Sequence, residues 1–403
     1  MFRALSHRNY RIFWLGAFLS NCGTWMQSVA QGWLVLHLTN SPFWLGLDAF
    51  MATAPGILLT LLGGVFADIV DRRRLLIFSQ SMAGIAALGL AALVSTGLVN
   101  PWMILAFSFV TGCCFALASP SYMAMTYDLV GREDVANAVA LNSTQFQLSR
   151  VIGPALAGVG FSLFGLAGCF YANGLSFIAV VVALTMVRPE AYSNAPRLQA
   201  ERHNIWHDLI EGLSYVRNRP RVTSLILLSA VTSLFGAPYF ALVPIYARDI
   251  FGLGESGLAL MMGVAGGGAF LGALLVAYLG DFRRKGWAVI IGGTVAGFCV
   301  TLFALSTNLV ISLVALFGIG FAIVVSVATE NTLLQKLVTD QMRGRVMSMF
   351  MMSFIGTMPI GNIAAGALSQ RFGVRHTLAV GGIIATLAPI FVALTNKRLR
   401  ELY

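Results

Sequence analysis

Residues 309–334 read LVISLVALFGIGFAIVVSVATENTLL, and this stretch decides the class of fold. It has no charged side chain before Glu330. At about 1.5 Å per residue, a helix of this length crosses the roughly 30 Å hydrocarbon core of a bilayer. Because a helix satisfies its backbone hydrogen bonds internally, it is stable in lipid. The stretch therefore predicts a membrane-spanning helix.

The whole chain has the composition of an integral membrane protein. Of its 403 residues, 58% are hydrophobic and 10% are charged, whereas soluble domains are about 45–50% apolar and about 25% charged. The weak alternation of membrane β-strands is absent. We predict an all-α membrane protein with twelve spans, at residues 11–38, 43–66, 75–97, 101–126, 135–163, 166–187, 221–247, 256–279, 287–305, 309–334, 346–371 and 375–395.

The 26 basic residues lie almost entirely in alternate loops between these spans. The exceptions are Arg248, Arg371 and Arg375, in loops on the opposite side, and Arg150, within a span. Because basic loops stay in the cytoplasm, we predict that both termini are cytoplasmic and that the protein resides in a cell (inner) membrane. Topology thus explains the net charge of +10 without nucleic-acid binding.

A polar stretch, residues 188–220, divides the spans into two sets of six. Its apolar side chains share one helical face, which is typical of a linker helix on the membrane surface. The two sets are also similar in sequence, and Gly153 superposes on Gly361. We predict an amino-terminal half, 1–187, and a carboxy-terminal half, 221–403, related as transporter repeats.

The loop after the second span, residues 63–74, reads GGVFADIVDRRR and resembles the signature loop of the major facilitator superfamily. Its glycine permits close helix approach, its aspartates can cap a helix or pair with basic residues, and its arginines anchor the cytoplasmic face. Ile69 stands where the family pattern usually has Arg. The resemblance implies conformational roles for Gly64, Asp68, Asp71, Arg72 and Arg73.

A second motif, SRVIGPALAG at residues 149–158, is similar to the Gly-Pro motif of exporters and antiporters in that superfamily. It implies a gating role for Gly153, Pro154 and Gly158. With GREDVANAVALN at 131–142, it resembles the branch that contains the enterobactin exporter and macrolide efflux proteins. That branch implies export of drugs or siderophores against inward proton flow.

Three acidic residues are candidates for proton coupling, because a carboxylate within a membrane is costly unless it serves a function. Asp48 lies a turn into the second span, Asp128 at the inner end of the fourth and Glu330 in the last turns of the tenth. Each also has a structural alternative, which for Asp48 is contact with interfacial water. The alternative partners are Arg72 or Arg132 for Asp128, and Lys336 or Arg345 for Glu330.

Polar residues within the spans are further candidates. Arg150 must face a carboxylate, backbone carbonyls or cavity water, so we expect a structural or gating role, with anionic substrate binding as the alternative. Polar side chains at helical spacing predict a water-filled substrate cavity, although hydrogen bonds between helices would explain them too. The cavity candidates are Asn21, Thr24, Trp25, Ser28, Gln31, Tyr122, Asn142, Gln145, Ser149, Ser229, Thr232 and Tyr239.

No combination of nucleophile, base and carboxylate suggests catalysis, and the five cysteines lack the spacing of metal ligands. We therefore predict a transporter and not an enzyme, with no cofactor and no metal. Its expected partners are a small-molecule substrate, protons and the lipid bilayer, and we expect a monomer. The alternatives are an importer or facilitator of another solute, and a membrane scaffold with the same fold.

Overall fold

The computed structural model describes residues 3–57, 59, 70–187 and 205–396, apart from the side chains of residues 205–210. Every regular element in these ranges is a helix, which confirms the predicted all-α class. The earlier elements are η1 (Arg3–Ser6), α1 (Arg8–Thr39), α2 (Pro42–Thr53), α4 (Arg72–Ser95) and α5 (Pro101–Met186). The later ones are α6 (Ile205–Arg217), α7 (Pro220–Val231), η3 (Thr232–Gly236), α8 (Tyr239–Ile245), η4 (Tyr246–Ile250), α9 (Gly254–Leu279), α10 (Lys285–Leu305), α11 (Leu309–Leu337), α12 (Asp340–Ile355), α13 (Thr357–Phe372) and α14 (Val374–Thr395).

Short polar residues set several helix ends. α1 stops at Asn40, which adopts the left-handed conformation (φ 49°), and Pro42 then opens α2. The Asp71 carboxylate caps α4 by accepting the backbone N–H of Arg74 at 2.8 Å. Asn100 caps α5 in the same way. These caps satisfy backbone donors that the first helical turn leaves without partners.

The helix α5 is 86 residues long, about 130 Å at the usual rise and several times the thickness of a bilayer. Its backbone leaves helical geometry at Gly131 (φ 72°) and Gly165 (φ 66°), where a left-handed conformation favours glycine. These glycines divide α5 into stretches 101–130, 132–164 and 166–186. The loops expected between three predicted spans are therefore reduced to single residues.

Two predicted spans in the later part of the chain are interrupted. Within 221–247, the α-helical geometry changes to wide π-type turns at Thr232–Gly236 and Tyr246–Ile250. Pro238 and Pro244 lie between these turns and have no N–H to donate, which disfavours an uninterrupted α-helix. Within 346–371, α12 and α13 meet at Gly356.

Eight helical stretches in the described part of the chain are long and apolar enough to cross a membrane, with α5 taken as one. The 32-residue helix α1 is not among them, because Asn21, Gln27 and Gln31 interrupt its apolar sequence. Large apolar side chains also face outward, as Ile85 and Val314 do with 65% of their surface exposed. Surfaces of this kind suit contact with lipid.

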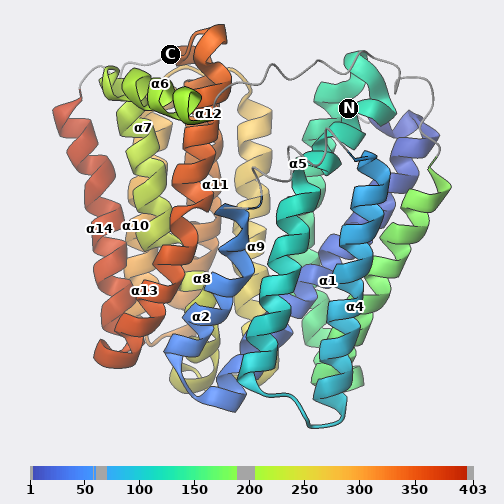
Figure 1. Cartoon of the computed structure of the whole chain (residues 1–403). Coiled ribbons are helices and arrows are strands. Elements are labelled where there is room, and N and C mark those ends of the chain that lie inside the picture. Colours follow the sequence, from blue (N-terminus) through green and yellow to red (C-terminus); the bar gives the residue numbers. More distant parts are fainter. Residues whose placement is uncertain (1–2, 58, 60–69, 188–204, 397–403) are drawn as a thin grey trace. The chain divides into compact units, whose positions relative to one another are not determined.

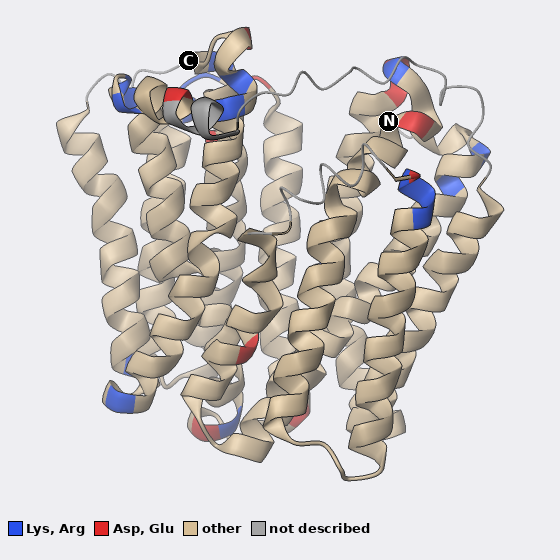
Figure 2. Ribbon diagram, in the orientation of Figure 1, with Lys and Arg blue, Asp and Glu red and all other residues tan. Residues whose placement is uncertain are grey.

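The chain divides into two compact units, Met1–Gln199 with Gly252–Gly263, and Ala200–Phe251 with Val264–Tyr403. In the first unit, α1 and α4 pack along α5 (Figure 1). In the second, α10 packs against α11 and α14. In each unit the charged residues gather toward the helix ends, as expected for membrane-spanning helices (Figure 2).

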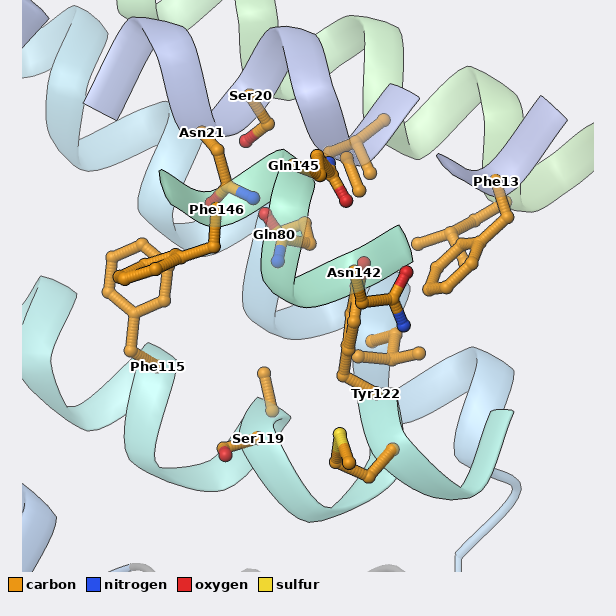
Figure 3. A pocket seen from close by; sticks show the side chains of 16 residues that line it. Phe13, Ser20, Asn21, Gln80, Phe115, Ser119, Tyr122, Asn142, Gln145 and Phe146 are labelled. Atoms are coloured by element: carbon orange, nitrogen blue, oxygen red, sulfur yellow. The ribbon is translucent and has the colours of Figure 1, made fainter. Parts of the chain in front are cut away.

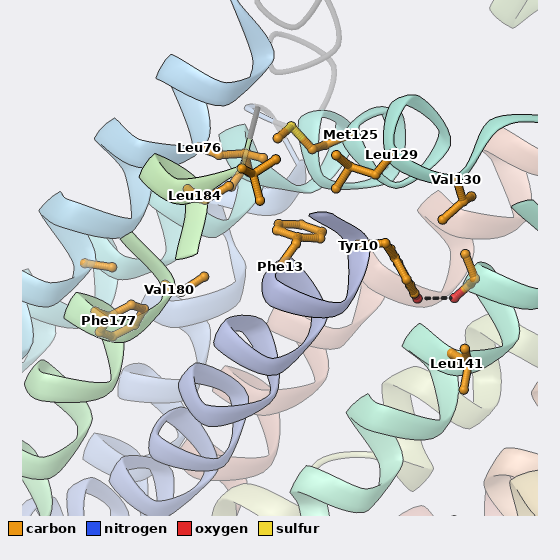
Figure 4. Close-up of a cluster of buried hydrophobic side chains, with 14 of the residues drawn as sticks. Tyr10, Phe13, Leu76, Met125, Leu129, Val130, Leu141, Phe177, Val180 and Leu184 are labelled. Carbon is orange, nitrogen blue, oxygen red and sulfur yellow. Dashed lines mark hydrogen bonds between the residues drawn. The ribbon is translucent and has the colours of Figure 1, made fainter. Parts of the chain in front are cut away.

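The core of the first unit lies among α1, α4 and α5 (Figure 4). Phe13, Leu76 and Leu184 are fully or almost fully buried there. The buried Tyr10 hydroxyl donates to the backbone carbonyl of Ala138 at 3.0 Å. This bond fixes the first turn of α1 against the middle stretch of α5.

Candidate functional site

A cavity of about 330 Å³ lies within the first unit, among α1, α4 and α5 (Figure 3). Cavities of about this size hold small organic molecules. Aromatic rings and carboxamides line it, and no lining side chain is charged. The aromatic residues are Phe13, Phe115, Tyr122 and Phe146, and the carboxamides are Asn21, Gln80, Asn142 and Gln145.

Four of the residues predicted to line a cavity are among them: Asn21, Tyr122, Asn142 and Gln145. Gln80 was not predicted, although it is a carboxamide inside a mostly apolar span and could have been found by that signal. The facing phenylalanines could not, since phenylalanines occur on every face of these apolar helices.

Two of the lining carboxamides also join helices. Asn142 Oδ1 lies 2.9 Å from the Tyr10 hydroxyl, which shares its one proton between this oxygen and the Ala138 carbonyl. Asn142 Nδ2 donates to Thr126 Oγ1 at 3.1 Å. Gln145 Nε2 donates to the backbone carbonyl of Trp14 at 3.3 Å. Cavity lining and helix packing, the two interpretations of the polar stripes, thus apply to the same residues.

Three other predicted cavity residues direct their hydroxyls to their own helices. Thr24 Oγ1 donates to the carbonyl of Ser20 at 2.9 Å, and Ser28 Oγ donates to that of Thr24 at 3.0 Å. Ser149 Oγ donates to the carbonyl of Gln145 at 2.9 Å. None of the three lines the cavity.

Asp48 on α2 is held by two other helices. Both of its carboxylate oxygens accept hydrogen bonds from Gln31 Nε2 on α1, each at 2.9 Å. One oxygen also accepts the hydroxyl of Ser108, on the first stretch of α5, at 2.5 Å. Asp48 is therefore part of an interhelical site, and Gln31 belongs to this site rather than to the cavity.

Glu330 on α11 is buried, with 1% of its surface exposed. It accepts the hydroxyl of Ser326, one turn earlier, at 3.0 Å. Its second oxygen has no hydrogen-bond partner within the described structure. A buried carboxyl group satisfied on only one oxygen is suited to binding and releasing a proton.

The ion-pair partners considered for Glu330 contact other acids in the described structure. Lys336 Nζ lies 2.5 Å from the Asp281 carboxylate, which also pairs with Lys285. Hydrogen bonds and charge from these two lysines lower the pKa of Asp281, in the loop before α10, to about 2. Arg345 pairs with Glu211 of α6 at 2.5 Å.

Asp128 forms the ion pair expected of it, with Arg72 and not Arg132. Arg72 Nη1 lies 2.8 and 3.0 Å from the two carboxylate oxygens. The neighbouring Arg73 donates to the backbone carbonyls of Leu184 and Thr185 at 2.6 and 2.5 Å. The two arginines therefore attach the start of α4 to two stretches of α5.

The other residues of the signature loop are only partly described. Asp71 is the cap of α4. Gly64 and Asp68 lie outside the described residues, so their predicted roles stay predictions.

In the Gly-Pro motif, Gly153 lies directly against α1. A Cβ atom at this position would be 2.3 Å from the Cβ of Trp25 and 2.9 Å from the carbonyl oxygen of Cys22. The guanidinium carbon of Arg150 lies 5.2 Å from the centre of the Trp25 ring, and that ring meets Phe146 edge-on at 5.8 Å. Trp25 thus links the motif to a residue of the cavity wall, and an aromatic face is a partner of Arg150 that the sequence did not predict.

Two other residues of the motif are Pro154 and Gly158. Pro154 lies inside the helix α5. A Cβ atom at Gly158 would have the Cβ of Ala259 as its nearest neighbour, at an ordinary contact distance of 3.4 Å.

Three predicted cavity residues, Ser229, Thr232 and Tyr239, belong to the second unit and are buried there. The Ser229 hydroxyl has no partner within the described structure. The Tyr239 ring meets Phe240 edge-on at 6.3 Å. Among the described residues, no three His, Cys, Asp or Glu side chains gather as metal ligands would.

Comparisons with known proteins identify the family of the chain. The family model described as transmembrane secretion effector matches residues 1–402. The multidrug efflux pump Tap of Mycolicibacterium fortuitum is 25% identical over 96% of this chain and 95% of its own. The enterobactin exporter EntS of Salmonella typhi is 23% identical over 98% of this chain and 94% of its own.

The fold is similar to that of solved transporters. One example is a bacterial homologue of the human lysosomal transporter Spinster in an inward-facing, unoccupied conformation. Its TM-score is 0.75 at 16% identity, with 98% of both chains covered. The chain belongs to the transmembrane secretion effector family of the major facilitator superfamily, a family of transporters and not of enzymes.

Proposed function

We propose that this protein exports amphipathic small molecules, drug-like or siderophore-like, in exchange for protons. The observation that carries the proposal is the uncharged cavity of the first unit, with aromatic walls and four carboxamides. Apolar walls with a few polar groups suit molecules that have both an apolar body and hydrogen-bonding groups. The names of the efflux and exporter relatives support the outward direction.

Asp48 and Glu330 are the proposed proton-binding groups. Asp48 binds side chains of two other helices, and Glu330 is buried with one oxygen that has no hydrogen-bond partner among the described residues. A carboxyl group that alternates between charged and neutral changes the free-energy balance between two conformations of a membrane protein. We assign Asp128 a structural role instead, since it already pairs with Arg72.

The contact of Gly153 with α1 and the stacking of Arg150 on Trp25 are the proposed gating elements. Both couple the middle stretch of α5 to α1, so a movement between these helices would alter them together. The three stretches of α5 support a topology of twelve spans in two halves of six. We further propose that both termini are cytoplasmic and that the working unit is a monomer.

A flux experiment tests the proposal. The purified protein is placed in liposomes that contain a pH-sensitive dye, and lipophilic cations, macrolides and siderophores are added in turn under an imposed pH gradient. We expect proton movement that starts on addition of a substrate. Substrate movement without proton movement would indicate a facilitator, and silence across the panel with folded protein would contradict proton-coupled export of these classes.

A further inference from the structure

A chain of carboxamides ends at the Asp48 carboxylate, and each donor in it points toward that carboxylate. Asn173, on the third stretch of α5, donates through Nδ2 to Gln27 Oε1 at 2.6 Å. Gln27 Nε2 donates to Gln31 Oε1 at 3.3 Å. Gln31 Nε2 then donates to both oxygens of Asp48 at 2.9 Å.

The far end of this chain is tightly packed. Asn173 is buried, and a Cβ atom at Gly23 of α1 would lie 2.6 Å from Asn173 Oδ1 and 2.3 Å from Ser176 Oγ. Glycine at this position therefore makes the space in which the amide chain crosses from α5 to α1. Any other residue would displace the chain or separate the helices.

The partners of Asp48 are neutral. Among the described residues, Gln31 on α1 and Ser108 on α5 are its hydrogen-bond donors, and no charged side chain pairs with it. His37, the titratable residue further along α1, is exposed. The charge state of Asp48 is thus balanced by the orientation of neutral dipoles, and aligned hydrogen bonds reinforce one another.

Proton uptake by Asp48 changes what this site requires. A hydronium ion supplies the proton: one O–H bond of the hydronium breaks, one O–H bond forms on the carboxylate, and a water molecule is left. The new O–H is a donor, so it needs an acceptor in place of one of the two groups that now donate to the carboxylate, the Gln31 amino group or the Ser108 hydroxyl. If the Gln31 carboxamide turns over, its Oε1 becomes that acceptor, and Gln27 and Asn173 must turn in sequence to keep every link.

We infer that Gln31, Gln27 and Asn173 are positioning residues for proton coupling, and that their hydrogen-bond chain reverses its direction when Asp48 takes up a proton. The inference rests on the proposed coupling role of Asp48. Reversal keeps each link between neighbouring members of the chain hydrogen-bonded while it transmits the charge state of α2 to α1 and to the third stretch of α5. The helix α1 and the third stretch of α5 are the two that meet at Gly23.

Infrared difference spectroscopy on the full chain in lipid tests this directly. The C=O band of protonated Asp48 is identified by its loss in Asp48→Asn and is followed against pH. We expect Gln31→Met to move the midpoint about one unit upward, a tenfold change in proton affinity, because the carboxylate loses its main donor. Gln27→Met and Asn173→Leu should each give a smaller shift in the same direction, because they weaken that donor from a distance.

The matched control is Gln335→Met. Gln335 is an exposed glutamine of α11, and its side chain donates a hydrogen bond to Asn331, one turn earlier on the same helix. Its midpoint should equal that of the wild type. If Gln27→Met and Asn173→Leu both behave like this control, the chain does not act on Asp48 and the inference fails. If the midpoints shift as expected but no substrate moves protons in liposomes, the proposed function fails and the amide chain stands.

Discussion

Gly153→Ala is the sharpest test of how closely α1 and α5 must approach. The added Cβ would lie 2.3 Å from the Trp25 Cβ, 2.9 Å from the Cys22 carbonyl oxygen and 3.1 Å from the Met26 backbone nitrogen. Carbon atoms prefer a separation of about 3.5–4.0 Å, so the helices must separate by about 1 Å. Overpacking of this kind costs about 1–3 kcal/mol.

Gly158→Ala on the same helix is the matched control, because its new Cβ would have 3.4 Å to the nearest atom. Both substitutions gain about 0.5–1 kcal/mol from the better helix propensity of alanine. This gain cancels in the comparison, so Gly153→Ala should be less stable than Gly158→Ala by about 1–3 kcal/mol.

The measurement is the unfolding of the two purified variants in mixed micelles with increasing denaturing detergent, followed by circular dichroism. Equal stability of the two variants would refute the reasoning, since it would mean that α1 does not approach Gly153 as the structure has it. Transport by the same pair then separates packing from gating. If Gly153→Ala exports at the wild-type rate, the motif has no role in the conformational cycle.

Three further outcomes are expected. Ala118→Phe places a ring in the cavity at a buried lining position. It should weaken equilibrium binding of a transported substrate at least about tenfold, and unchanged affinity would show that the substrate does not bind in this cavity. Arg72→Gln leaves Asp128 without its partner and should lower the unfolding free energy by about 1 kcal/mol, because the pair is partly exposed. The double variant Arg72→Gln, Asp128→Asn should recover part of this stability, and a double variant with no recovery would refute the pairing. Because the pKa of Asp281 is lowered to about 2 from its usual 3.8, its contribution to stability is present above that usual value and is lost as the pH falls toward 2. Asp281→Asn should therefore be less stable than the wild type at pH 7, the difference should vanish in acid and shrink in salt, and a pH-independent difference would contradict this assignment.

Much of the architecture follows from local sequence. The prediction of a span at 287–305 corresponds to α10 (Lys285–Leu305), and that at 375–395 to α14 (Val374–Thr395). In both cases an uninterrupted apolar run lies between polar residues, and such a run has one stable conformation in lipid. Local sequence is therefore sufficient to predict a span where no other conformation competes with the helix.

Other parts depend on geometry that composition does not encode. Gly131 and Gly165 each end one helical stretch and begin the next, so the loops expected between three predicted spans are reduced to single residues. A hydropathy pattern detects apolar length but not the dihedral angles of a single glycine. The π-type turns at Thr232–Gly236 and Tyr246–Ile250 are missed for the same reason.

The sequence indicated which residues belong to the candidate site but not which of them contact one another. Asp48 and Gln31 were both identified, yet their contact was not, and Ser108 was overlooked as one serine among many in apolar helices. The partners are distant in sequence, so helical periodicity carries no information about them. Asp128 was easier, because a basic cluster at a helix start has few acids within reach.

The central claim is that proton movement and substrate movement are coupled through a membrane carboxylate. Substrate exchange and proton-driven transport, measured side by side in liposomes for the wild type, Asp48→Asn and Glu330→Gln, test it most directly. The account predicts that at least one amide variant exchanges substrate across the membrane at a near wild-type rate but no longer moves substrate against a gradient when a pH difference is imposed. Proton-driven transport that persists in both variants at the wild-type level would contradict it.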